Sequence, residues 1–129
     1  MNRNIIFVAI LLIAVLVGAF IFYNNQNVPQ TSKPETFSGD ATISMGTDSY
    51  SPQNLKIKKG SKVTFLNSSD SLKWPASDLH PSHLIYSEFD PKEPIKTGES
   101  WTFQFDKVGE WGYHDHLSPY ITGTITVVD

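Results

Sequence analysis

The chain has only four histidines, and they fall in two short groups whose spacing could hold a metal ion. His80 and His83 are separated by two residues, and His114 and His116 by one. Histidine is the commonest metal ligand among side chains, and random placement would rarely pair every copy. The sequence therefore predicts one metal site that uses all four imidazoles.

The spacing within each group favours chelation of a single ion. On a β-strand, residues i and i+2 point to the same face about 7 Å apart, so His114 and His116 can place two rings around one metal. Pro81 stiffens the loop that carries His80 and His83. Nitrogen-only sites suit Cu(II), Zn(II) and Ni(II), and the Irving–Williams order places Cu(II) highest. Copper is the predicted metal, and zinc is the second choice.

Simpler roles for these histidines stay open. They could be exposed polar residues near loop ends, and His80 in particular could hydrogen-bond to a backbone carbonyl. Asp115 and Glu88 are candidate acceptors for the histidine N–H groups. No other catalytic scheme is indicated, because the chain has no cysteine, no phosphate-binding glycine loop and no serine in a nucleophile elbow.

The N-terminal part of the chain predicts attachment to a membrane. Residues 5–23 form an unbroken apolar run, long enough at helical rise to cross a hydrocarbon core of about 30 Å. Large apolar and aromatic residues occupy the place where a cleaved signal peptide has small ones, so an uncleaved transmembrane anchor is favoured for residues 1–23, and a cleaved signal segment is the alternative that stays open. Arg3 before this helix favours an extracytoplasmic location, at the cell membrane, for the remainder.

The rest of the chain divides into a linker and one domain. Residues 24–38 are rich in Asn, Gln, Pro, Thr, Ser and Lys, which predicts a flexible linker. Residues 39–129 have the usual length of a single domain. The net charge is −3 and the lysines are mostly scattered, so nucleic-acid binding is not expected.

Within residues 39–129, apolar and polar residues alternate in short runs that Gly, Pro, Asn and Asp interrupt, which is typical of strands in a sandwich. A long irregular stretch over residues 71–94 contains one short strand-like run at 83–87, and loops of this length are commonly functional. About seven strands in about ninety residues predict an all-β sandwich. The other predicted strands cover residues 41–45, 55–57, 63–66, 101–105, 109–114 and 123–128.

Several of these segments resemble the cupredoxin superfamily, the fold of plastocyanins, pseudoazurins and the domains of multicopper oxidases. The resemblance spans residues 39–129 and implies a Greek-key β-sandwich that binds copper. Its carriers are Tyr50-Ser51-Pro52, Leu55-Lys56-Ile57-Lys58-Lys59-Gly60, Val63-Thr64-Phe65-Leu66-Asn67, Gly109-Glu110-Trp111-Gly112-Tyr113-His114 and Gly123-Thr124-Ile125-Thr126-Val127.

The ligands of a blue type 1 copper centre are missing from this resemblance. Single-domain members carry a pattern like Tyr-His-Cys-x-x-His-Pro-x-Met, in which Asp115 here takes the cysteine position, Ser118 the histidine and Ile121 the methionine. Lys73 falls near the usual upstream histidine. A type 1 centre is excluded, since its thiolate is absent.

Two motifs resemble multicopper oxidases instead. Tyr-His-x-His is matched at residues 113–116, and His-Pro-x-His-Leu at residues 80–84. The oxidase motif has a further histidine where this chain has Ile85, so a trinuclear cluster is not expected in a monomer. Strand alternation turns Asp115 inward and its two histidine neighbours outward. This resemblance implies copper in an exposed site or between identical subunits of a homo-oligomer.

We therefore predict an extracytoplasmic copper-binding protein with a non-blue histidine site, for copper holding, delivery or electron transfer with a redox or copper-transfer protein partner. Two alternatives stay open. One is a small copper oxidase or reductase that shares its site between subunits. The other is a metal-free interaction module that kept only the sandwich.

Overall fold

The computed structural model describes residues 13, 15–20, 36–37 and 39–129. Residues 13 and 15–20 are helical and belong to a unit, Met1–Ser32, that is separate from the unit Lys33–Asp129. Within the described residues, no helix is both long and apolar enough to cross a membrane. Most of the predicted anchor and of the predicted linker lies outside the described residues.

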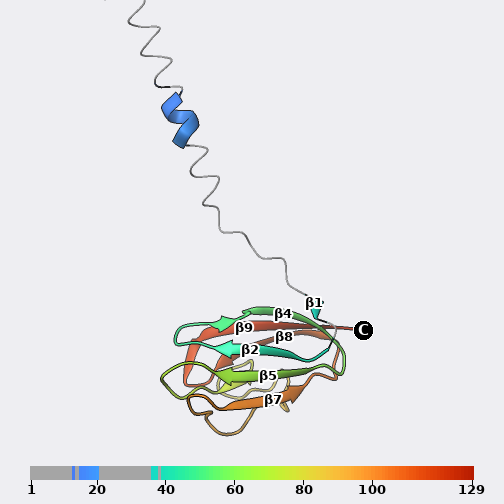
Figure 1. The fold of residues 1–129 in the computed structure, drawn as a ribbon. Coiled ribbons are helices and arrows are strands. Elements are labelled where there is room, and N and C mark those ends of the chain that lie inside the picture. The colour runs from blue at the N-terminus through green and yellow to red at the C-terminus, as the bar shows by residue number, and fades with distance from the viewer. Residues whose placement is uncertain (1–12, 14, 21–35, 38) are drawn as a thin grey trace, which may run out of the picture. The chain divides into compact units, whose positions relative to one another are not determined.

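The second unit is a β-sandwich of two sheets (Figure 1). One sheet has the order β1-β4-β9-β8-β6, and the other has the order β3-β2-β5-β7. The predicted all-β sandwich is confirmed. The strands in chain order are β1 (Thr36–Phe37), β2 (Ala41–Met45), β3 (Tyr50–Ser51), β4 (Asn54–Lys58), β5 (Lys62–Asn67), β6 (Pro75–Ser77), β7 (Ser100–Gln104), β8 (Gly109–Asp115) and β9 (Ser118–Val128).

Alternation along the strands builds the core between the sheets. In β5, Val63 and Phe65 are fully buried, whereas their neighbours Lys62 and Leu66 are exposed. Tyr113 of β8 faces the same core and lies 5.5 Å from Phe65 between ring centroids. Full burial of such a side chain stabilises the fold by about 2 kcal/mol. The core therefore fixes which residues of β8 face inward.

The segment between β6 and β7 positions the predicted metal site. It covers residues 78–99 and contains turns but no strand. It begins beside β8, because β6 pairs with the last part of that strand and Ala76 lies opposite His114. Tyr86 and Phe89 are buried and anchor the segment in the core.

The six strands predicted outside the irregular stretch are confirmed as β2, β4, β5, β7, β8 and β9. The strand predicted at residues 83–87 is wrong. Ile85 donates its N–H to the carbonyl of Asp78 at 2.8 Å. This hydrogen bond closes a loop over residues 78–85 and does not pair two strands. β3 and β6 were not predicted, and β1 lies inside the segment predicted as a linker, where it pairs with β4.

Candidate metal centre

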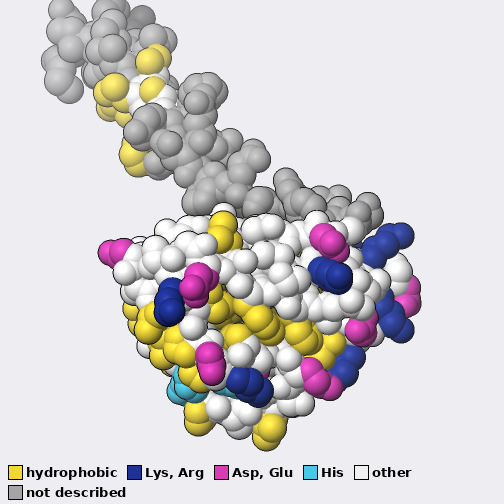
Figure 2. All heavy atoms as spheres, turned by 60° about the horizontal axis from the view of Figure 1, so that its bottom comes forward, with side chains coloured by type: hydrophobic (Ala, Val, Ile, Leu, Met, Phe, Trp, Pro, Cys, Tyr) yellow, Lys and Arg dark blue, Asp and Glu magenta, His cyan; other side chains and the backbone are white. Residues whose placement is uncertain are grey.

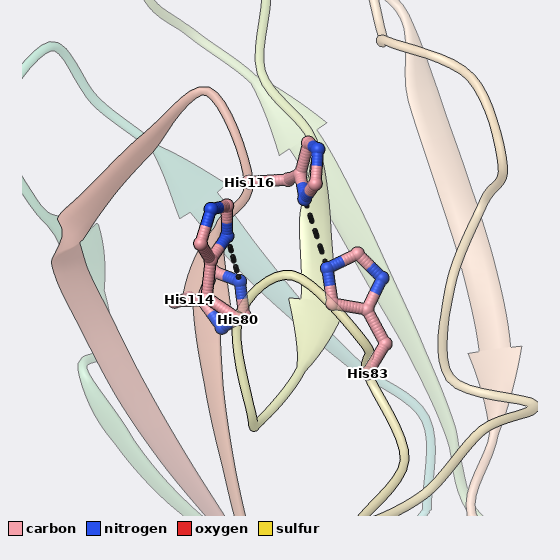
Figure 3. A group of neighbouring side chains, drawn as sticks. All are labelled: His80, His83, His114 and His116. Atoms are coloured by element: carbon pink, nitrogen blue, oxygen red, sulfur yellow. Dashed lines mark hydrogen bonds between the residues drawn. The ribbon is translucent and has the colours of Figure 1, made fainter.

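The four histidines converge at one place in the domain (Figure 3). One nitrogen from each ring can be chosen such that all four lie within 4.8 Å of one another. His116 Nδ1 lies 2.9 Å from His83 Nε2, and His80 Nδ1 lies 3.3 Å from His114 Nε2. We call this group the histidine cluster.

Two segments bring the cluster together. His114 lies in β8, and the backbone N–H of His116 donates to the carbonyl of Trp74 at 2.8 Å just after that strand ends. The other two histidines lie on a tight turn that the N–H of His83 closes on the carbonyl of Leu79 at 2.7 Å. His83 has φ +54°, a left-handed conformation that is uncommon outside glycine and frequent at functional sites.

Two carboxylates orient two of the rings. Asp90 Oδ2 lies 2.8 Å from His83 Nδ1, and Asp78 Oδ1 lies 2.9 Å from His114 Nδ1. Because a carboxylate accepts, each Nδ1 must carry the proton and donate it. In the neutral rings the lone pairs of both Nε2 atoms therefore point into the cluster, the arrangement that metal-binding histidines commonly have.

The candidate carboxylates named from the sequence, Asp115 and Glu88, are wrong. Glu88 forms a surface ion pair with Lys107 at 2.9 Å, and Asp115 lies inside the sandwich. Asp78 and Asp90 take the role instead. Asp78 comes just after β6, and Asp90 comes seven residues after His83. Both lie in a stretch without regular structure, so no sequence periodicity indicates that they meet the histidines.

Asp90 is held as a carboxylate by its neighbours. Its burial acts to raise the pKa, but hydrogen bonds from His83, Lys92 and Trp74 outweigh that effect and hold the pKa of Asp90 below its usual range. The Trp74 indole N–H donates to Asp90 Oδ1 at 2.8 Å. Asp90 therefore stays charged across the physiological range, as an acceptor for His83 must.

His116 is biased toward the neutral form. Burial lowers its pKa, and the three other histidines lower it further. Its ring centroid lies 4.6 Å from that of Trp74. Metal binding requires the unprotonated imidazole, so a lowered pKa of His116 reduces competition from protons.

Gly112 makes room for the Asp78 carboxylate. A Cβ atom at this glycine would collide with Asp78 Oδ2, because that oxygen occupies the space next to the Gly112 Cα atom. We expect Gly112→Ala to push the carboxylate away from His114 and to weaken metal binding by about 10–100-fold, as loss of such a partner usually does. Titration with Cu(II) against a competing chelator measures this. Asp78→Asn should show a similar loss, and unchanged affinity in both variants would contradict a role for Asp78.

The interior of the sandwich holds an ion pair where the resemblance aligns type 1 ligands. Lys73 Nζ lies 3.3 Å from Asp115 Oδ2. Both side chains are buried, with exposed fractions of 3% and 1%. Asp115 Oδ1 accepts from the N–H groups of Trp74 and Leu117 at 3.0 and 3.2 Å. Near this pair, the hydroxyl of Tyr50 finds no hydrogen-bond partner among the described residues. All four histidines lie in the cluster and the chain has no cysteine, so this interior position offers copper neither imidazole nor thiolate.

The prediction that Asp115 and the neighbouring His114 point to opposite faces of β8 is confirmed. The prediction that the histidines form an exposed site is wrong. Asp115 faces the interior, and His114 lies on the opposite face of the strand. His114 is nevertheless only 2% exposed, because the segment between β6 and β7 packs against it, and His83, which lies on that segment, is 5% exposed. All four rings come from one chain, so no second subunit is needed to assemble the cluster.

The cluster fits a metal ion with nitrogen ligands. Two nitrogens bound at about 2.0 Å from one ion lie roughly 2.8–3.3 Å apart at right-angle to tetrahedral geometry. The two hydrogen-bonded nitrogen pairs of the cluster, at 2.9 and 3.3 Å, already match this range. Since all four nitrogens lie within 4.8 Å of one another, the widest pair would need to close by at most about 1.5 Å for tetrahedral geometry, or by about 0.8 Å to lie on opposite sides of one ion.

The fold and the histidine cluster define a β-sandwich that carries a candidate metal centre outside its apolar core, and comparisons with known proteins give its family. The chain belongs to the family described as Cupredoxin-like domain, whose profile matches residues 11–127. The relationship to cupredoxins is thereby confirmed, in a chain that lacks the type 1 cysteine.

Individual relatives agree with this assignment. The chain is 26% identical to the plastocyanin of Scenedesmus fuscus over 106 residues, which covers 68% of this chain and 99% of that protein. Among solved structures, a purple cupredoxin from Nitrosopumilus maritimus is 28% identical with a TM-score of 0.59, and the match covers 69% of this chain and 100% of that one. A reduced amicyanin mutant shares the fold at 20% identity with a TM-score of 0.60, over 70% and 83% of the two chains.

Proposed function

We propose that this chain is a copper-binding cupredoxin whose metal lies in the histidine cluster and not in the interior of the sandwich. The observation that carries this proposal is the convergence of four imidazoles from one chain, two of them oriented by carboxylates. A site with only nitrogen donors binds Cu(II) with higher affinity than Zn(II). Membership of the Cupredoxin-like domain family also supports copper as the metal.

The role that we propose for the site is to hold copper for delivery to a protein partner or for electron transfer. Bound copper would supply affinity for further donor groups and a one-electron couple. The protein supplies the rest: Asp78 and Asp90 fix the tautomers of His114 and His83, and the segment between β6 and β7 limits access of water. The apolar run at residues 5–23 supports a location at the outer face of the cell membrane.

Metal analysis and electron paramagnetic resonance of the copper-loaded full chain test the proposal. We expect one copper per chain, hyperfine lines from several nitrogens and none of the intense colour that a thiolate ligand gives. Addition of Zn(II) in equal amount should displace little copper. A chain that retains no copper after removal of the excess would refute the proposal and favour a metal-free interaction module.

A further inference from the structure

The histidine cluster is asymmetric, because one of its four members lies at the surface. His80 is exposed, whereas His83 and His114 are buried and His116 is half-buried. Part of the histidine surface is visible from outside, beside hydrophobic side chains (Figure 2). The two buried members are His83, on the segment between β6 and β7, and His114, which packs against it.

His80 is also the member with the weakest attachment to the protein. His83 and His114 are each bonded to a carboxylate, and His116 packs against Trp74. The only hydrogen bond of the His80 ring within the described residues is the 3.3 Å contact with His114, another member of the cluster. The metal itself would therefore be the main restraint on this ring.

The turn that carries His80 presents a largely apolar rim, and the charge beside it is the partly exposed carboxylate of Asp78, which precedes Leu79. Leu79 and Leu84, on the same turn, are 63% and 71% exposed, and Leu117 on the facing turn is 46% exposed. Residues 79–85 contain no Asp, Glu, Lys or Arg. An apolar rim penalises the approach of a charged ligand more than that of a neutral one, because a charge loses more hydration on burial.

We infer that His83, His114 and His116 hold copper as a fixed triad, and that His80 is an exchangeable fourth ligand whose place a neutral imidazole from outside can take. This inference rests on the proposed function. It gives the site a route for delivery, since an acceptor protein that presents a histidine can replace His80 without opening the buried part of the cluster. The acceptor is thereby defined by its chemistry as an imidazole donor.

Copper-loaded His80→Ala and His83→Ala full chains, compared with the unchanged chain, test the inference. We expect His80→Ala to keep one copper per chain with an affinity lowered by about tenfold or less, and His83→Ala to lose at least about 100-fold. Imidazole labelled with ¹⁵N should alter the nitrogen hyperfine pattern of His80→Ala at a concentration at least about tenfold below that needed for the unchanged chain. Azide, as the charged comparison, should need a higher concentration than imidazole.

The outcomes separate the two proposals. If the unchanged chain binds no copper, the proposed function fails. If the unchanged chain binds copper but His80→Ala loses it as fully as His83→Ala does, His80 is an essential ligand and only this inference fails. Absence of any ¹⁵N coupling in copper-loaded His80→Ala would overturn it as well. Thermal unfolding of the metal-free chains shows whether each variant is folded.

Discussion

A His114→Asn chain should bind Cu(II) at least about 100-fold more weakly than the unchanged chain, because loss of a buried ligand that the fold holds in place costs more than loss of its hydrogen-bond partner. His114 is the most buried member of the cluster, at 2% exposure, and it lies on a strand and not on a turn. Its Nε2 lone pair is aimed inward by Asp78 at 2.9 Å. Asparagine can still donate to Asp78, yet it offers no nitrogen at the position of Nε2.

The measurement is a Cu(II) titration against a competing chelator, with electron paramagnetic resonance to count the nitrogens. Tyr113→Phe is the matched control, since this neighbour faces the core and its hydroxyl has no hydrogen-bond partner among the described residues. We expect the control to bind copper like the unchanged chain. Equal affinity in His114→Asn would mean that the metal, if it binds, lies elsewhere.

The fold could be predicted from the sequence because its strands carry their own pattern. In β7, Trp101 and Phe103 alternate with polar residues, and this period is a property of the strand itself. β6 was not predicted, because Pro75–Ser77 is short and completely buried, so it shows no alternation. The run at residues 83–87 has the apolar character of a strand but forms none. Leu84 and Ile85 are apolar but exposed, and Leu84 belongs to the rim of the cluster.

The identity of the cluster could also be predicted, whereas its surroundings could not. Pairs of histidines at short spacing are visible in the sequence, and the structure brings all four together. Asp90 meets His83 only through the course of an irregular loop, which no sequence period describes. Asp78 depends in addition on the absence of a side chain at Gly112 across the sheet. Contacts of this kind follow from tertiary structure alone.

One residue connects the cluster to the interior. Asp115 lies between His114 and His116 in the sequence but points the opposite way, into the sandwich. Its carboxylate accepts from the backbone of Trp74 and Leu117, so it ties the end of β8 to the segment that precedes β6. Lys73 balances its charge. The two residues that the resemblance aligns with type 1 ligands therefore support the cluster from the other face of the strand.

Lys73→Met should lower the free energy of unfolding of the metal-free chain by about 3–5 kcal/mol, because it leaves the Asp115 carboxylate buried without its cation. Lys73 Nζ also donates to the carbonyl of Thr47 at 2.9 Å, and that bond is lost too. Domains of this size shift in Tm by several degrees per kcal/mol, so the fall should exceed about 10 °C. Urea unfolding followed by tryptophan fluorescence gives the free energy directly.

The double variant Lys73→Met, Asp115→Asn identifies the cause of that loss. Asparagine keeps an oxygen for the N–H groups of Trp74 and Leu117 but carries no charge, so we expect it to recover at least about half of the stability that Lys73→Met removes. Lys58→Met, at an exposed position of β4, should change the free energy by less than about 0.5 kcal/mol. If the double variant is no more stable than Lys73→Met alone, the loss arises from packing around Lys73. The buried charge of Asp115 would then not be its cause.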